Sequence, residues 1–317
     1  MKPTLRPLHC YSIATLLRPL HCYSIATLLR PLHCYLIAIT LLLLTSCEKP
    51  VPTDDTAPPT VTLTFTPVSR DFTRTPNITA FTKLNVQLFN ADGEKVFDKV
   101  KTQTNDGADF GTMSLKLSEG TYTIVAVGHS STISATIKSP TVCQFTASDG
   151  EKLTDTFCHC STISIPSSST ATAQYTLPMY RVAAMIQFVL TDTQVPDNFT
   201  HFLMEYTGGS ANFNPTTLEG ITKSTQSERR LRNAQNVHQA YTFPYLSTSC
   251  TLKMTVSGLD ADGTVIRKRT FDNVPVTRNR ITTYTGHFFE DGDGTFTQSD
   301  FGFVVHTDWD GEDTITF

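Results

Sequence analysis

The sequence predicts an all-β protein, and three observations carry that prediction. Apolar and polar residues alternate at period two in many short segments, and turn residues separate those segments. Residues 61–165 show no convincing helical period. Aromatic residues make up 10% of the 317-residue chain, which indicates a packed core rather than disorder. Short strands at this spacing are typical of a β-sandwich.

Residues 1–46 have the features of an export signal. Residues 36–44 are apolar except for Thr40, about half of the roughly 20 residues that a membrane-spanning helix needs. Four basic residues and no acidic residue precede this run, as in the charged start of a signal peptide. The leader also holds three 12-residue copies beginning with Leu-Arg-Pro-Leu-His-Cys-Tyr. We interpret them as a tandem duplication, because structural repeats recur every 20 residues or so at least.

The end of the apolar run, residues 44–47 (Leu-Thr-Ser-Cys), resembles the bacterial lipobox. That resemblance implies lipidation of Cys47, cleavage before it, and anchoring of the mature chain at the outer membrane. The alternative is an ordinary signal peptide followed by an incidental cysteine. Residues 47–60 are rich in proline and polar residues, which predicts an extended linker.

Residues 61–168 are predicted to form the first β-sandwich and residues 169–317 the second, with a small-polar boundary near residues 166–170. In the first, Val61–Thr66 alternates strictly, and Gly120–His129 has apolar residues on both faces, as expected of a central strand. In the second, the run 180–190 predicts one long strand. The polar segment 224–238 is predicted to be an exposed loop with two helical turns.

The composition argues against several functions. The chain has a net charge of −4, whereas a nucleic-acid-binding protein is expected to carry an excess of basic residues. No nucleophile elbow, zinc-protease motif or phosphate-binding loop is present, so we predict no enzyme and no cofactor. Cys158-His159-Cys160 and the 291–294 run (Asp-Gly-Asp-Gly) do not match metal-site spacings, so no metal is predicted.

Four cysteines remain after the leader and Cys47, and their pairing cannot be derived from the sequence. They are Cys143, Cys158, Cys160 and Cys250. An exported chain permits disulfides. Buried thiols, or a bridge from the 158–160 pair to Cys143, are the alternatives.

Three stretches together resemble the fimbrillin and fimbrial-anchor superfamily of Bacteroidota: the lipobox at Cys47, residues 117–126 and residues 273–289. The resemblance implies two tandem transthyretin-like β-sandwiches after a lipoprotein signal peptide. It also implies that the protein acts in cell adhesion as a fimbrial subunit or anchor, with other fimbrial subunits and a host or bacterial surface ligand as partners.

In this superfamily, subunits assemble by donating a β-strand to a neighbour. Two segments of this chain alternate suitably for that role, Val61–Thr66 and Phe301–Phe317. The alternative is that each segment completes its own domain. In polymerising relatives an arginine-specific protease removes the first strand, and Arg70 and Arg74 lie where such a cut would fall.

A second functional hypothesis is a surface glycan-binding lipoprotein of a polysaccharide-uptake system. Such a protein is expected to present a platform of exposed aromatic residues. The sequence contains a single tryptophan, Trp309, which counts against that hypothesis.

The lipobox interpretation makes a direct prediction. Cells that express the wild-type chain are expected to incorporate radioactive palmitate into it, and Cys47→Ala should abolish the labelling, because the thiol is the only attachment point that the motif provides. Cys250→Ala is the matched control and should label normally. Equal labelling of wild type and Cys47→Ala would contradict the prediction.

Overall fold

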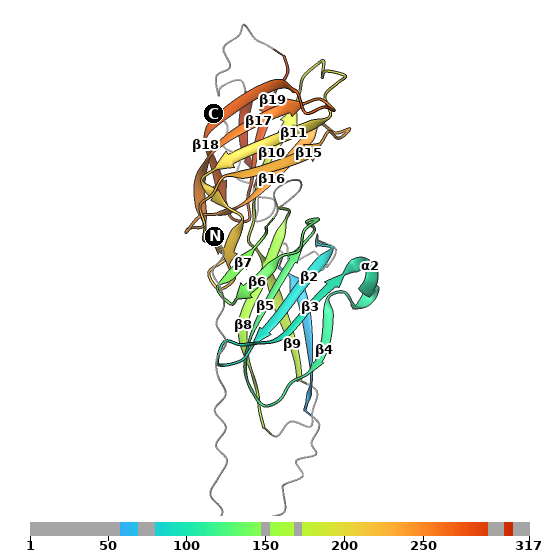
Figure 1. Ribbon diagram of the computed structural model, residues 1–317, viewed down its shortest axis with the longest axis vertical. Helices are drawn as coiled ribbons and strands as arrows, with labels where there is room; N and C mark the ends of the chain where they lie inside the picture. The colour runs from blue at the N-terminus through green and yellow to red at the C-terminus, as the bar shows by residue number, and fades with distance from the viewer. Residues whose placement is uncertain (1–57, 69–79, 147–152, 168–172, 291–300, 307–317) are drawn as a thin grey trace, which may run out of the picture. The chain divides into compact units, whose positions relative to one another are not determined.

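A computed structural model gives the architecture (Figure 1). It describes residues 58–68, 80–146, 153–167 and 173–290, with the backbone of residues 301–306. This part of the chain is mostly β-structure in four sheets, which confirms the all-β prediction. Within the described ranges the α-helix is limited to α2 (Gln103–Asp106).

The N-terminal sheet has seven strands in the order β3-β2-β5-β8-β9-β1-β4. They are β1 (Thr60–Pro67), β2 (Lys83–Phe89), β3 (Lys95–Thr102), β4 (Thr112–Lys116), β5 (Gly120–His129), β8 (Thr156–Ile165) and β9 (Ala173–Arg181). β2 and β3 form a hairpin whose turn includes Gly93, which takes a φ of 79° that favours glycine. The sheet wraps around a buried cluster that includes Leu63, Val86 and Phe110.

Strand β5 is buried on both faces, as its sequence predicts. Ile124 and Ala126 belong to the cluster enclosed by the N-terminal sheet. Val125 and Val127 point to the other face and belong to a second cluster. The N-terminal sheet therefore needs a cover on its outer face as well.

That cover is a small four-stranded sheet in the order β14-β13-β7-β6. Its strands are β6 (Thr136–Ser139), β7 (Val142–Gln144), β13 (Asn212–Asn214) and β14 (Glu219–Gly220). Two strands thus come from before residue 150 and two from after residue 210, and β7 pairs with β13 through Cys143 and Phe213. The cluster beneath them also contains Cys158 and Phe243, so both halves of the described chain share it.

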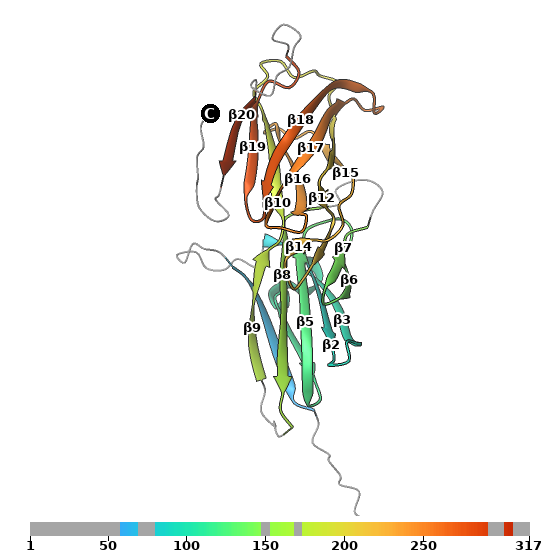
Figure 2. The same ribbon diagram turned by 90° about the vertical axis from the view of Figure 1, so that its left-hand side faces the viewer.

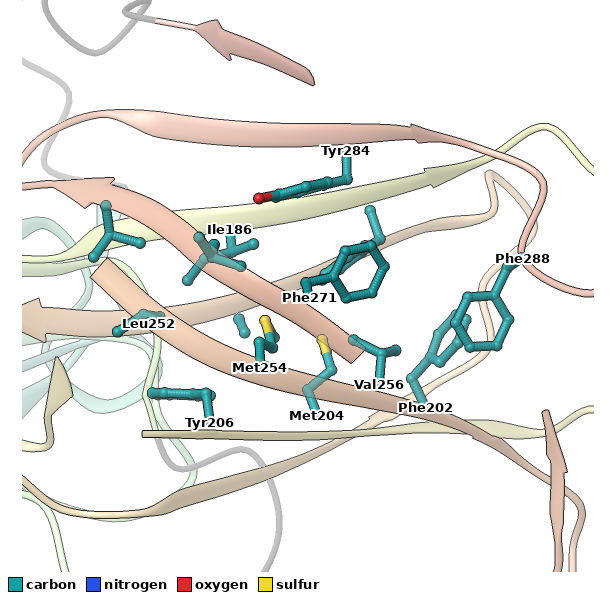
Figure 3. Close-up of a cluster of buried hydrophobic side chains, with 14 of the residues drawn as sticks. Ile186, Phe202, Met204, Tyr206, Leu252, Met254, Val256, Phe271, Tyr284 and Phe288 are labelled. Atoms are coloured by element: carbon teal, nitrogen blue, oxygen red, sulfur yellow. The ribbon is translucent and has the colours of Figure 1, made fainter. Parts of the chain in front are cut away.

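The C-terminal sheet pair consists of a five-stranded sheet, β12-β16-β10-β19-β20, and a four-stranded sheet, β15-β11-β17-β18 (Figure 2). The first contains β10 (Ala184–Leu190), β12 (Gly209–Ser210), β16 (Val237–Pro244), β19 (Ile281–Gly286) and β20 (Phe301–His306). The second contains β11 (His201–Thr207), β15 (Gln226–Leu231), β17 (Ser249–Leu259) and β18 (Val265–Thr277). Side chains from the two sheets meet in the core that Figure 3 shows, where the rings of Phe271 and Tyr284 pack edge to face with their centroids 5.1 Å apart.

The single strand predicted across residues 180–190 is wrong. β9 ends at Arg181 and β10 begins at Ala184. β9 pairs with β1 and β8 in the N-terminal sheet, whereas β10 pairs with β16 and β19. The sequence does not reveal the break between β9 and β10, because the apolar run continues across it and strands of different sheets have similar compositions. The predicted boundary between residues 168 and 169 lies outside the described residues.

The loop predicted at residues 224–238 is also wrong, because it contains β15 and the start of β16. β15 alternates as a strand should, but its buried residues are polar: Gln226, Glu228 and Arg230. The exposed positions include Leu231, which is 67% exposed. In β15 the polar side chains are buried and an apolar side chain is exposed, which is the reverse of the usual arrangement. A hydrophobicity pattern therefore does not identify β15 as a strand.

His238 of β16 is a buried histidine inside an aromatic cluster. Its ring lies 4.6 Å from that of Phe202 and 6.1 Å from that of Phe199, measured between centroids. Neither ring nitrogen has a hydrogen-bond partner. Burial, with a smaller contribution from the Arg232 charge, lowers the pKa of His238 from 6.5 to about 4.

This burial predicts a pH dependence of stability. Between about pH 6.5 and pH 4 the unfolded chain binds a proton that folded His238 refuses, so the free energy of unfolding falls as the pH falls through that window. His238→Phe fills the same space without a titratable group and should reduce the slope. Urea titrations at pH 7.5, 5.5 and 4.5 measure it. An unchanged slope in the variant would contradict the assignment.

Candidate functional site

β1 is the centre of the candidate site because it lies inside the N-terminal sheet. On one side Val61–Pro67 pairs in parallel with Ala173–Met179 of β9. On the other side Thr60–Thr64 pairs antiparallel with Thr112–Lys116 of β4. A strand with neighbours on both sides has its backbone donors and acceptors satisfied along its length.

The side chains of β1 divide between its two faces. Val61 and Leu63 are 0% exposed and Phe65 is 1% exposed, all within the N-terminal cluster. The threonines between them face outward, and the Thr62 hydroxyl lies 3.2 Å from that of Ser114. Burying each apolar side chain stabilises the fold by about 1.5–3 kcal/mol. The period-two pattern of the sequence is therefore realised in the structure.

β9 depends on β1 because its pairing with β8 is short. β8 and β9 pair only at Phe157 with Arg181 and at Cys158 with Tyr180. Pro178, which has no N–H, lies beyond these pairs. His159 of β8 bridges the opening there: its Nδ1 donates to the Pro178 carbonyl at 2.8 Å, and its Nε2 lies 2.7 Å from the Ser161 hydroxyl.

β4 depends on β1 even more strongly. In the described sheet its strand neighbour is β1 alone. Side-chain support comes from Lys101, whose ammonium donates to the Thr112 carbonyl at 2.7 Å. Removal of β1 would thus expose one edge of β9, one edge of β4 and the apolar cluster between them.

β20, the other candidate donor, completes its own sheet from the edge. Phe301–His306 pairs antiparallel with Ile281–Gly286 of β19. In the order of its sheet β20 is terminal, so it has one neighbour where β1 has two. Val61–Thr66 and residues 301–306 of the second segment therefore pair within their own chain, as the alternative hypothesis expected. Residues 307–317 of that segment lie outside the described residues.

The other residues predicted from sequence are placed as follows. Cys47, Arg70 and Arg74 lie outside the described residues, as does the 291–294 run. Val68, which is 42% exposed, is the last described residue before the segment with the two arginines. Its N–H donates to the Met179 carbonyl at 2.9 Å, so pairing with β9 persists to that point.

The four described cysteines are free thiols. Cys143 and Cys158 are buried in the cluster under the small sheet, and Cys160 packs against it. His159 lies on the opposite face of β8, where Pro178 and Ser161 occupy both ring nitrogens. The three residues of the Cys-His-Cys run therefore do not converge on one point.

A cluster of two acidic residues and a histidine lies just after the ends of β10 and β19, and the sequence patterns do not predict it. Ligand atoms of Asp192, His287 and Glu290 lie within 4.8 Å of one another. The Asp192 carboxylate accepts the backbone N–H groups of Phe288, Phe289 and Glu290 at 2.6–2.9 Å. A hydrogen bond from the Thr193 hydroxyl is the main cause that lowers the pKa of Glu290. The Asp192 and Glu290 carboxylates hold the loop after β19 in place.

Two cavities lie near the junction between the N-terminal sheet and the C-terminal sheet pair. The first, of about 320 Å³, lies where β1 ends and includes Val68, Tyr180 and Arg278 in its lining. The second, of about 380 Å³, is lined by polar residues that include Asp155, Arg230 and Gln239. Both fall near the lower end of the roughly 300–1,000 Å³ usual for ligand pockets.

A search of the described residues for a helix able to cross a membrane, judged by length and hydropathy, finds none.

The geometry defines a class of β-rich chains in which both terminal strands complete their own sheets, and solved structures share this fold. A proposed adhesin from Bacteroides ovatus matches at 13% identity with a TM-score of 0.50, covering 79% of this chain and 94% of that one. A proposed polysaccharide-binding protein from Bacteroides thetaiotaomicron matches at 10% identity with a TM-score of 0.51, covering 78% and 96%. The fimbrial anchor protein Mfa2 from Porphyromonas gingivalis matches at 13% identity with a TM-score of 0.45, covering 82% and 100%.

The chain belongs to a family of unknown function (DUF6562), whose model matches residues 53–317. No curated protein matches the sequence. Proposed adhesins and fimbrial proteins are among the structural neighbours, as the sequence resemblance predicted. The two neighbours with TM-scores of 0.50 and 0.51, a proposed adhesin and a proposed polysaccharide-binding protein, show a common fold and, at these identities, no more than that.

The burial of β1 predicts a strong asymmetry between its two faces. Phe65→Ala should lower the free energy of unfolding by about 3–5 kcal/mol, because it leaves a cavity in the N-terminal cluster. Thr66→Ala, on the outer face of the same strand, should cost less than about 1 kcal/mol. Urea denaturation of the two variants measures the difference. Equal effects would contradict the interior placement of β1.

Proposed function

We propose that this protein is a lipid-anchored fimbrial subunit, anchor or accessory protein that acts in adhesion at the cell surface, without catalysis. In this proposal it assembles with other subunits by exchange of a β-strand at the position of β1. One observation carries the proposal: β1 lies between β9 and β4, with its apolar side chains 0–1% exposed. The fold shared with the neighbours is consistent with it.

The physical argument rests on what β1 leaves behind. Without it, β9 and β4 present unpaired backbone groups on both walls of an apolar groove, an arrangement that aggregates unless it is covered. A strand from a second copy that alternates apolar and polar residues would satisfy both walls at once. Phe301, Phe303 and Val305 of β20 have that alternation in the sequence.

The proposed trigger is proteolysis after Arg70 or Arg74, which follow Val68 in the sequence. Cutting there would separate β1 from β2 while leaving the rest of the N-terminal sheet covalently intact. An uncut chain keeps β1 in place and therefore ends a polymer, as an anchor does. The cut thus distinguishes a polymerising role from an anchoring role.

We also propose that the described sheets form two tandem transthyretin-like sandwiches behind the Cys47 anchor, with residues 1–46 as the signal peptide. Strand pairing supports a division at Val182 and Ala183, because β9 pairs with the N-terminal sheet. The proposed location is the outer membrane surface, where the lipid at Cys47 would hold the start of the chain.

The alternative function, glycan binding, has a narrower basis. Among the described residues Tyr180 is the exposed aromatic side chain, at 48%. One aromatic residue does not make the platform expected of a polysaccharide-uptake protein. It does, however, line a cavity of about 320 Å³.

The proposal predicts which chains polymerise. Three purified forms are compared on unheated SDS gels: residues 48–317, residues 75–317, and residues 75–290. The second lacks β1 and should form a ladder of SDS-resistant species, because its groove is open and its donor strand is present. The first should run as a monomer because its groove is filled, and the third should form no ladder because it lacks the donor.

A peptide with the sequence of β1, residues 60–67, should bind the 75–317 form and suppress the ladder. The same peptide with Leu63→Asp and Phe65→Asp is the matched control and should do neither. A ladder that persists in the 75–290 form would show that β20 is not the donor. A 75–317 form that is folded, monomeric and unresponsive to the peptide would refute strand exchange at β1.

A further inference from the structure

The turn between β18 and β19 carries Arg278 and Asn279, which lie within the 273–289 stretch of the family resemblance. The proposed strand exchange does not involve this turn. Backbone hydrogen bonds fix this turn: the Arg278 N–H donates to the Thr248 carbonyl at 2.7 Å, and the Asn279 N–H donates to the Ala183 carbonyl at 2.9 Å. Asn279 has a φ of 61°, a left-handed conformation that asparagine tolerates better than most residues. The turn therefore presents its side chains in a defined position.

The Arg278 side chain is held by neutral groups. Its Nη1 donates to the carbonyls of Thr217 and Leu218 at 3.2 and 3.1 Å. It takes part in no ion pair with a described carboxylate, and its Nε and Nη2 remain as donors. The fold therefore holds the Arg278 guanidinium in position, but no described carboxylate pairs with its positive charge.

The neighbouring arginine behaves differently. Arg181 forms a bidentate pair with Asp155, at 2.8 and 2.9 Å. A further donor of Arg181, Nη1, donates to Oδ1, the side-chain amide oxygen of Asn279, at 2.8 Å. This contact turns the Asn279 amide so that its nitrogen stays available as a donor beside Arg278. Arg181 is a positioning residue, and Arg278 supplies the uncompensated charge.

These groups line the cavity of about 320 Å³ together with Val68, Tyr180, Leu218 and Thr248. Tyr180 and Val68 are 48% and 42% exposed, so an apolar surface and an aromatic ring stand beside the donors. The cavity combines a fixed guanidinium, an amide, a hydroxyl and a ring face. Its volume suits a compact ligand rather than an extended chain.

We propose that this cavity binds an acidic sugar residue. The carboxylate would accept charge-assisted hydrogen bonds from Arg278, the sugar ring would pack on Tyr180, and hydroxyl groups would bond Thr248 and the Asn279 amide. The proposal goes beyond the proposed function and does not depend on strand exchange, because the cavity exists in the chain with β1 in place.

The test is calorimetric titration of residues 48–317, so that β1 remains. The probes are trigalacturonate, a glucuronate trisaccharide and sialyllactose, each compared with its neutral counterpart. At least one acidic probe should bind and its counterpart should bind much more weakly. Arg278→Gln should weaken binding by about tenfold or more, as expected for loss of a charge-assisted hydrogen bond.

Two further variants separate this site from general effects. Tyr180→Ala removes the exposed ring with little risk to folding and should also weaken binding. Arg229→Gln removes the same charge from an exposed position on β15 and should bind like wild type. Thermal unfolding of each variant checks that the fold is retained.

Failure of all three acidic probes to bind, equal binding of the neutral counterparts, or equal weakening by Arg229→Gln would overturn the proposal. A synthetic peptide of residues 308–313, which is acidic and contains Trp309, serves as the competing ligand. Binding of that peptide in place of the sugars, lost in Arg278→Gln, would assign the cavity to a peptide and overturn the sugar assignment. None of these results bears on the ladder experiment.

Discussion

The parallel pairing of β1 with β9 is the contact on which the N-terminal sheet depends. β8 and β9 share only two residue pairs, and β4 has β1 as its strand neighbour, so β1 holds β9 and β4 together at one end of the sheet. It does so with the first described residues of the chain. β1 is therefore the segment on which this end of the N-terminal sheet depends.

The rest of the structure is held by side chains that reach between distant segments. Leu153, just before β8, donates its N–H to the Glu228 carboxylate at 3.1 Å, and its carbonyl accepts from Arg230 at 2.7 Å. Glu228 is 0% exposed, and such a charge is tolerable in the interior only when it is paired and hydrogen-bonded. The small sheet adds a second link, because β7 and β13 pair across it. The two halves of the described chain thus share a core.

These long-range contacts explain which parts of the fold the sequence predicts. β1 and β11 alternate along their sequences, and the burial of their side chains alternates in the same way. The second half of β5 is apolar on both faces in the sequence and is buried on both. The sequence pattern does not predict β15, because its buried residues are polar. Two of them, Glu228 and Arg230, bond the backbone of Leu153, 75 and 77 residues away. In the sequence, Arg278 and Asn279 are marked only as part of the family pattern over residues 273–289. The cavity that they line depends on Val68, Tyr180 and Thr248, which no local pattern brings together.

The two terminal strands differ in what their departure would cost. β20 is at an edge and gives up one set of backbone hydrogen bonds, whereas β1 is interior and gives up two sets together with a buried apolar face. Spontaneous dissociation of β1 would be rare for that reason. A covalent cut does not make dissociation more frequent, but it prevents a dissociated β1 from returning to the same chain. β20 can leave β19 and regain its bonds in a neighbour's groove at lower cost. Exchange under the proposed function would therefore have a direction, with the edge strand as donor and the interior position as acceptor, and the protease would decide when it begins.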